Sequence, residues 1–213
     1  MTKQPTFPVI KPVAKFLPFV AAFALAGCIS LGSEPPPSLL VLTPDNRVNE
    51  GTMRSGLQSA ALVVLEPDVP RKLATNRVPV QIGNARIAYL TDAIWADKPA
   101  KLIQQLIGET IAAKNGRLVL NNADAAGKEN EQLSGTLIEF GIEENTKEAV
   151  VMFDAVQLRG GAPVRKKRFE ARESLTEIAH VQAGSALNAA ANDVAEQVAE
   201  WLAPEKAETK PDS

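Results

Sequence analysis

The sequence predicts an α+β domain in which two helices pack on a mainly antiparallel sheet. Three observations indicate this fold class. Short apolar segments with period-two alternation recur along the 213-residue chain, two longer segments carry apolar residues at helical spacing, and strands precede a helix twice. The repeated order also predicts two similar strand–strand–helix halves. That prediction rests on element order alone, because the halves share no close sequence similarity.

The first half of the predicted domain contains short apolar strands bounded by turn residues. Gly83-Asn84 separates two of them and predicts a hairpin, because this pair favours a tight turn. A polar loop at residues 44–58 follows the first strand. The predicted strands cover residues 39–42, 60–65, 78–82, 86–90 and 117–120.

One amphipathic helix is predicted within this first half. Asp97 is a suitable N-cap, Pro99 suits the first helical turn, and Asn115-Gly116 ends the segment. We therefore expect a helix over residues 98–114. Its apolar stripe consists of Leu102, Ile103, Leu106, Ile107 and Ile111.

The second half repeats the order after a polar loop at residues 121–130. Three strands are predicted at residues 136–142, 149–158 and 164–175. A second amphipathic helix follows them and ends before Pro204. Its apolar stripe consists of Leu187, Ala191, Val194, Val198 and Trp201.

The N-terminal region combines a basic leader, a short apolar run and a single cysteine. The only cysteine, Cys28, follows Leu25-Ala26-Gly27 at the end of an apolar run that begins at Phe16. This run is too short to span a bilayer, which takes roughly 20 residues in a helix, and its length fits a signal peptide. The alternative is a chance cysteine near an ordinary cleavage site or in a buried helix. A basic leader precedes the run and contains Lys3, Lys11 and Lys15.

The pattern resembles the precursors of bacterial lipoproteins. This resemblance implies that residues 1–27 are a signal peptide, that cleavage falls between Gly27 and Cys28, and that diacylglycerol is attached to the Cys28 thiol. Two or three acyl chains, palmitate among them, would then anchor the domain in a membrane. If Cys28 is acylated, the folded domain has no cysteine for a disulfide or a thiolate metal site.

Composition divides the rest of the chain into a tether, a domain and a tail. Residues 28–38 contain three consecutive prolines and predict an extended stalk of about 30 Å. Residues 39–203 are the size of one domain, and the charged residues 204–213 predict a disordered tail. The domain is therefore expected to work close to its membrane.

Charge and residue usage argue against several classes of function. Without residues 1–27 the chain has 20 basic and 25 acidic residues, a formal net charge of −5, which argues against nucleic acid as a partner. There is no phosphate-binding glycine-rich motif, and a single histidine argues against a transition-metal site. His180 and Ser185 are the candidates for a Ser-His-Asp triad, but a nucleophile elbow requires a glycine two positions after the serine. We expect no catalytic residue, no metal and no cofactor.

Three further features have both a structural and a functional interpretation. Tyr89 and Trp95 flank the entry of the first helix and either pack in the core or contact a ligand. The basic run Arg165-Lys166-Lys167-Arg168 either contacts anionic headgroups or an acidic partner, or solvates an edge strand, with its side chains divided between two faces. The many alanines of the last helix either allow close approach of a subunit or bury the helix against its own sheet.

The middle of the chain resembles a known family of lipoproteins. The resemblance is carried by Leu62-Val63-Val64-Leu65-Glu66-Pro67, residues 73–80 and residues 86–99, which lead into the first helix. These stretches are similar to the ABC-type transport auxiliary lipoproteins, which are similar to paraquat-inducible protein C, over about residues 39–203. The family has no catalytic residues to transfer, so the resemblance implies a function in binding and leaves the ligand-binding residues unidentified.

The resemblance implies a periplasm-facing lipoprotein that partners a mammalian-cell-entry-type substrate-binding protein and an ABC transporter. Together they would move lipids between the inner and outer membranes. Some relatives assemble into rings, so a homo-oligomeric ring is also implied. Ile29 stands where many inner-membrane lipoproteins of Gram-negative bacteria have aspartate, which indicates the outer membrane. The alternative function is a structural lipoprotein that scaffolds envelope assembly, and a hydrolase is a third hypothesis.

Overall fold

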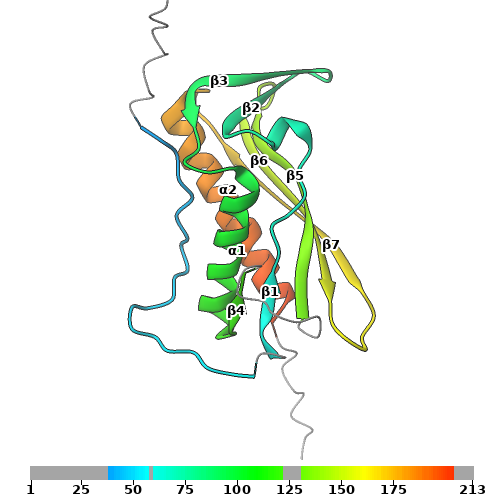
Figure 1. Ribbon diagram of the computed structural model, residues 1–213. Helices are drawn as coiled ribbons and strands as arrows, with labels where there is room; N and C mark the ends of the chain where they lie inside the picture. The colour runs from blue at the N-terminus through cyan, green and yellow to red at the C-terminus, as the bar shows by residue number, and fades with distance from the viewer. Residues whose placement is uncertain (1–37, 58–59, 122–130, 204–213) are drawn as a thin grey trace, which may run out of the picture. The chain divides into compact units, whose positions relative to one another are not determined.

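A seven-stranded sheet with two helices on one of its faces forms the fold (Figure 1). The computed structural model describes residues 38–57, 60–121 and 131–203. Its helices and sheet confirm the predicted α+β class. The predicted signal peptide, Cys28 and most of the stalk lie outside the described residues, as do nine residues of the loop at 121–130 and the tail at 204–213.

The elements follow the predicted order, with differences at their ends. Lys98 is the N-cap of the first helix instead of Asp97, whose carboxylate accepts the N–H of Lys98 at 2.7 Å. Gly116 ends that helix at a φ of 65°, as its residue type predicts. The elements are β1 (Leu62–Val64), η3 (Arg71–Leu73), β2 (Arg77–Ile82), β3 (Arg86–Ile94), α1 (Pro99–Asn115), β4 (Val119–Leu120), β5 (Glu131–Glu143), β6 (Glu148–Leu158), β7 (Arg165–Ser174) and α2 (His180–Trp201).

The sheet is organised around β5, with which three strands pair. β6 runs antiparallel along one edge of β5. On the other edge, β1 pairs in parallel with residues 131–133 and β2 pairs in parallel with residues 142–143. An isolated bridge between Asp68 and Thr136 lies between these two pairings. β1 and β2 therefore act as two segments of one interrupted strand along β5.

The order of strands and helix recurs in the two halves, but the pairing of the strands does not. β5, β6 and β7 form an antiparallel meander that leads into α2. In the first half, β2 and β3 form the predicted hairpin, while β1 pairs in parallel with β4 and β5. The sheet is thus mixed, and its longest pairings are antiparallel.

Both helices lie on the same face of the sheet, and their apolar stripes meet the inward side chains of the strands (Figure 1). Phe140, Phe153 and Phe169 of β5, β6 and β7 belong to this core, as do Leu106 of α1 and Val194 of α2. We call the opposite side of the sheet the helix-free face, because the described part of the chain places no α-helix on it. In these residues, neither helix is long and apolar enough to cross a bilayer.

Residues 38–57 form an extended strap that runs along the two helices (Figure 1), and this corrects the predicted strand at residues 39–42. Within that range only Leu40 makes a bridge, with Trp95. The alternation that predicted a strand is present, because Leu40 and Leu42 pack against the core while Leu39 and Val41 are exposed.

Beyond Leu40, whose backbone bonds to Ile94 and Ala96, the strap is not a strand because helices and not another strand lie beside it. Helices use their backbone groups internally, so helix side chains bind the strap instead. Asn188 Oδ1 accepts the N–H of Thr43 at 2.7 Å, and Asn192 Oδ1 accepts that of Asp45 at 2.8 Å. On α1, a carboxylate oxygen of Glu109 accepts another strap N–H at 2.7 Å. The strap is thereby fixed to both helices.

Candidate functional site

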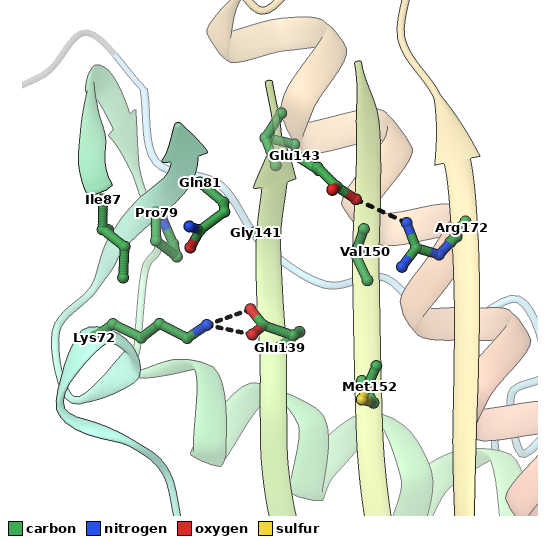
Figure 2. A pocket seen from close by; sticks show the side chains of 11 residues that line it. Lys72, Pro79, Gln81, Ile87, Glu139, Gly141, Glu143, Val150, Met152 and Arg172 are labelled. Carbon is green, nitrogen blue, oxygen red and sulfur yellow. Dashed lines mark hydrogen bonds and ion pairs between the residues drawn. The ribbon is translucent and has the colours of Figure 1, made fainter. Parts of the chain in front are cut away.

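The helix-free face is hollowed where β2, β5, β6 and β7 lie side by side (Figure 2). The hollow has a volume of about 250 Å³, and we call it the sheet pocket. It combines an apolar floor with charged side chains at its rim. The lining residues are Lys72, Pro79, Gln81, Ile87, Glu139, Gly141, Ile142, Glu143, Val150, Met152 and Arg172.

The floor of the sheet pocket depends on the close approach of β2 and β5 at Gly141. A Cβ at position 141 would lie 2.5 Å from the carbonyl oxygen of Pro79 and 2.8 Å from its Cγ. Only glycine fits this position without displacing Pro79. Val150 and Met152 of β6 extend the floor beside it, and Figure 2 shows both at the surface of the sheet.

One rim of the pocket is an ion pair between η3 and β5. The ammonium group of Lys72 contacts both carboxylate oxygens of Glu139, as Figure 2 shows. The hydroxyl of Tyr89 donates a hydrogen bond to the Lys72 carbonyl at 3.2 Å, which ties η3 to β3. The segment between β1 and β2 is therefore held over the interrupted edge of β5.

The other rim is formed by Arg172 of β7 and the carboxylates around it. Its guanidinium group binds Glu170 at 2.6 Å, Glu143 at 2.9 Å and Glu148 at 3.1 Å. These contacts, led by the hydrogen bond to Glu143, raise the pKa of Arg172 above its usual value. The pocket lining itself has two cations and two carboxylates, because Glu148 and Glu170 bind Arg172 from outside it. The rim is therefore charge-paired.

The lining of the sheet pocket has no hydroxyl, thiol or imidazole side chain. It includes no serine, threonine, cysteine, histidine or tyrosine, and both of its cations are paired with carboxylates. Across the described residues, no group of three or more His, Cys, Asp or Glu is placed to hold a metal ion. The pocket can accept an apolar group on its floor and a basic group at its rim.

The histidine and serine considered for a triad do not line the sheet pocket. His180 is the first residue of α2, and both it and Ser185 are exposed. They border a separate surface hollow that has no carboxylate among its lining residues, so the structure assembles no Ser-His-Asp triad there. Gly27 and Cys28, the residues of the predicted cleavage and lipidation, lie outside the described residues.

The two aromatic residues near the start of α1 pack against other side chains of the domain. Trp95 is fully buried, and its ring centroid lies 4.9 Å from that of Phe140 at an interplanar angle of 38°. This confirms core packing for Trp95. Tyr89 is half-buried, with the guanidinium carbon of Arg77 at 5.4 Å from its ring centroid. Neither aromatic residue lines the sheet pocket.

The basic run of β7 divides between the two faces of the sheet, as predicted. On the helix-free face, Arg168 Nε lies 2.6 Å from Asp154 and Lys166 Nζ lies 3.5 Å from it. The hydrogen bond from Arg168 is the main interaction that holds the pKa of Asp154 below its usual value. On the other face, the guanidinium carbon of Arg165 lies 4.9 Å from the ring centroid of Trp201.

The alanines of α2 are buried within the domain. They belong to the core formed by the helices and the sheet, which confirms burial against its own sheet as their role. The fully buried alanines are Ala183, Ala190, Ala191, Ala195 and Ala199.

Sequence reasoning missed the residues of the sheet pocket. Lys72 and Glu139 are 67 positions apart, and neither has a local motif that predicts their contact. Gly141 was the one available signal, because a glycine inside a strand often marks a close backbone approach. The pocket could not be inferred before the neighbours of β5 were known.

The fold and the site define a small α+β domain with a charge-paired surface pocket. Residues 42–199 match the family model of the ABC-type transport auxiliary lipoprotein component. The match covers most of the chain, and the chain belongs to this family. It is therefore a lipoprotein-family auxiliary component of an ABC transport system, associated with the cell envelope, and this role indicates a non-catalytic function.

Two solved structures share the fold. A crystal structure of a protein from Xanthomonas campestris, described by the family model DUF330, is similar with a TM-score of 0.64 and 15% identity, over 77% of this chain and 93% of that one. A crystal structure of an uncharacterized protein is similar with a TM-score of 0.60 and 15% identity, over 70% of this chain and 95% of that one. At this identity the likeness concerns the fold alone. No curated protein matches the chain.

Proposed function

We propose that the chain is a lipid-anchored, periplasm-facing auxiliary component of an ABC transport system that moves lipids between the inner and outer membranes. It binds a mammalian-cell-entry-type substrate-binding protein of that system and performs no catalysis. The observation that carries this proposal is the family match over residues 42–199. In this function Cys28 carries diacylglycerol and palmitate in the outer membrane, and copies of the domain assemble into a ring.

The sheet pocket supports a function that works by contact. Its volume of about 250 Å³ lies below the range of ~300–1,000 Å³ typical of sites that enclose a small molecule. A pocket of this size suits one side chain of a partner protein. Val150 and Met152 would receive the apolar part of that side chain, and the carboxylates of Glu139 and Glu143 would bind a basic end.

A second candidate function is a structural lipoprotein that scaffolds envelope assembly without handling lipid. The continuous core between the sheet and the helices favours it, because the interior of the domain is filled by its own side chains. Under the preferred function, the lipid path would have to lie outside this core, in a partner or between copies. The two candidates therefore differ in the identity of the bound protein.

Co-purification with variants of the sheet pocket tests the preferred function. Met152→Lys places a charge on the apolar floor, while Val156→Lys changes a half-buried, outward-facing residue of the same strand that does not line the pocket. We expect the native lipoprotein and the Val156 variant to co-purify with a mammalian-cell-entry-type protein, and the Met152 variant to lose it. If the native lipoprotein captures no mammalian-cell-entry-type protein, the scaffold function is favoured.

Anchoring is tested separately in the native host. Mass spectrometry of the mature N-terminus should find acyl groups on Cys28, and Cys28→Ala should reproduce the envelope-permeability defect of deleting the gene. Deletion of the partner transporter should give the same defect. An unmodified chain that still begins at Met1, or full complementation by an unlipidated domain, would contradict this part of the proposal.

A further inference from the structure

The strap fixes the point at which the chain leaves the domain toward its N-terminus. The N–H of Leu40 donates to the carbonyl of Ile94 at 2.8 Å, and the N–H of Ala96 donates to the carbonyl of Leu40 at 2.8 Å. The side chain of Leu40 lies against Gly184 of α2, where a Cβ would be 2.7 Å from Leu40 Cδ2. Ser38, two residues earlier, therefore leaves from a fixed place beside the start of α2.

Three exposed apolar side chains lie around this exit point. Leu39 is 52% exposed, Val41 is 57% exposed and Val181 is 58% exposed. We call these three residues the exit patch. They border a surface hollow of about 430 Å³, and none of the ten residues that line the hollow is Asp, Glu, Lys or Arg. In a chain with 23% charged residues, such a surface is expected to contact something apolar.

We propose that the exit patch contacts the surface of the membrane that holds the lipid anchor. This inference rests on the proposed lipidation of Cys28. The ten residue steps from Cys28 to Ser38 can span at most about 36 Å, so the exit point stays within that distance of the membrane surface. Exposed leucine and valine side chains at this place can enter the boundary between headgroups and acyl chains.

The C-terminal end of α2 lies far from the exit patch and serves as the comparison. α2 has 22 residues and is therefore about 33 Å long. Arg165 lies against Trp201 at its C-terminal end, so the turn between β6 and β7 lies near that end, away from the exit patch (Figure 1). Val164 in this turn is 62% exposed, similar to Val181. With the exit patch on the membrane, Val164 and the basic start of β7 point away from it.

Photolabelling from the lipid phase tests the orientation. The processed lipoprotein, purified from its native host, would be reconstituted in vesicles of phosphatidylethanolamine and phosphatidylglycerol that contain a diazirine-bearing phospholipid. Flotation of the vesicles reports anchoring, and peptide mass spectrometry after irradiation locates the label. We expect label on residues 38–42 and 180–185, severalfold above that on residues 159–165.

Two surface valines provide matched variants. Val181→Asp should remove most of the label from the exit patch, while Val164→Asp should leave it unchanged, and both should melt near the wild-type temperature. Label that is uniform or concentrated on residues 159–165 would overturn the inference while the anchor stands. The exit patch could also stay unlabelled while Val181→Asp changes the oligomeric mass. That result would show that the patch contacts a second copy of the chain, and it would also overturn the inference. Chains that do not float would overturn the anchor itself.

Discussion

The two faces of the sheet are built from the same strands and have different properties. On the helix-covered face, Val151, Phe153 and Ala155 of β6 are buried in the core. Their neighbours on the helix-free face, Met152 and Asp154, are only partly buried. Alternate residues of one strand therefore stabilise the fold on one side and form a contact surface on the other.

This difference separates stability from binding. Substitutions on the helix-covered face leave cavities or unpaired groups in the core, where each change costs several kcal/mol. Ion pairs on the helix-free face are solvated, and such pairs contribute little to stability. Binding on the helix-free face can therefore change while the fold is retained. Five predictions test this separation.

The largest effect is expected from a charge in the centre of the helix-covered face. Leu106→Asp and Val194→Asp each bury an unpaired carboxylate, because Leu106 is 2% exposed and Val194 is fully buried. The cost of several kcal/mol is comparable with a total stability of ~5–15 kcal/mol. Thermal melting followed by circular dichroism should show unfolded or strongly destabilised domains. Met152→Asp on the helix-free face is the control and should melt close to wild type.

The next largest effect is expected at Glu131, a buried charge at the start of β5. Its carboxylate binds Arg117 at 2.8 Å, Arg159 at 3.0 Å and Gln157 at 2.5 Å. Glu131→Gln removes the charge and leaves Arg117 without its partner, which should cost about 3 kcal/mol in urea unfolding. The same change at the solvated pair, Asp154→Asn, should cost less than about 1 kcal/mol. Equal losses would contradict the distinction between the two faces.

The contribution of Glu131 to the stability of the domain should also depend on pH. Burial by itself raises the pKa of this carboxyl, but hydrogen bonds from Arg117, Gln157 and Arg159 outweigh burial and hold the pKa below its ordinary value of 4.5. The stability it contributes is therefore present above pH 4.5 and is lost as the pH falls through the lower folded-state pKa. The stability difference between wild type and Glu131→Gln should be full at pH 7 and shrink in acid.

A smaller effect is expected at Gly141, in the floor of the sheet pocket. Gly141→Ala forces a Cβ against Pro79, and overpacking of this kind costs about 1–3 kcal/mol. The methyl group should also narrow the floor of the sheet pocket and weaken partner binding. Gly160→Ala is the matched control, because a Cβ there meets nothing within 4 Å. A Gly141→Ala protein with wild-type stability and binding would show that β2 and β5 can separate freely.

The smallest effect on stability is expected from the rim of the sheet pocket. Arg172→Ala removes three ion pairs, but the side chain is 42% exposed, so the loss in unfolding free energy should be below about 1 kcal/mol. Added salt should reduce it further, because screening weakens exposed pairs. Partner co-purification should fall despite the stable fold. A loss above about 2 kcal/mol in urea would place Arg172 among the residues that stabilise the core.

Local patterns predicted the helices and most strands with small errors at their ends. The apolar stripe of α1 and the glycine after it are properties of neighbouring residues, and so is the alternation along β6 and β7. The same alternation at residues 39–42 was misleading, because an extended strap on a helix pair has the same pattern as a strand. Whether such a segment forms a strand depends on the element that lies beside it. Here that element is α2, whose Asn188 and Asn192 contact the strap only in the folded domain.

The sequence by itself determined the fold class, the two buried helix stripes and the division of the basic run on β7, because each follows from spacing along a single element. The tertiary structure alone decided that β1 and β2 share one edge of β5, that the strap crosses the helices and that the sheet pocket exists. These features depend on which backbone groups remain unpaired and on contacts between residues far apart in the chain. Lys72 contacts Glu139 because η3 lies over β5 between its pairings with β1 and β2.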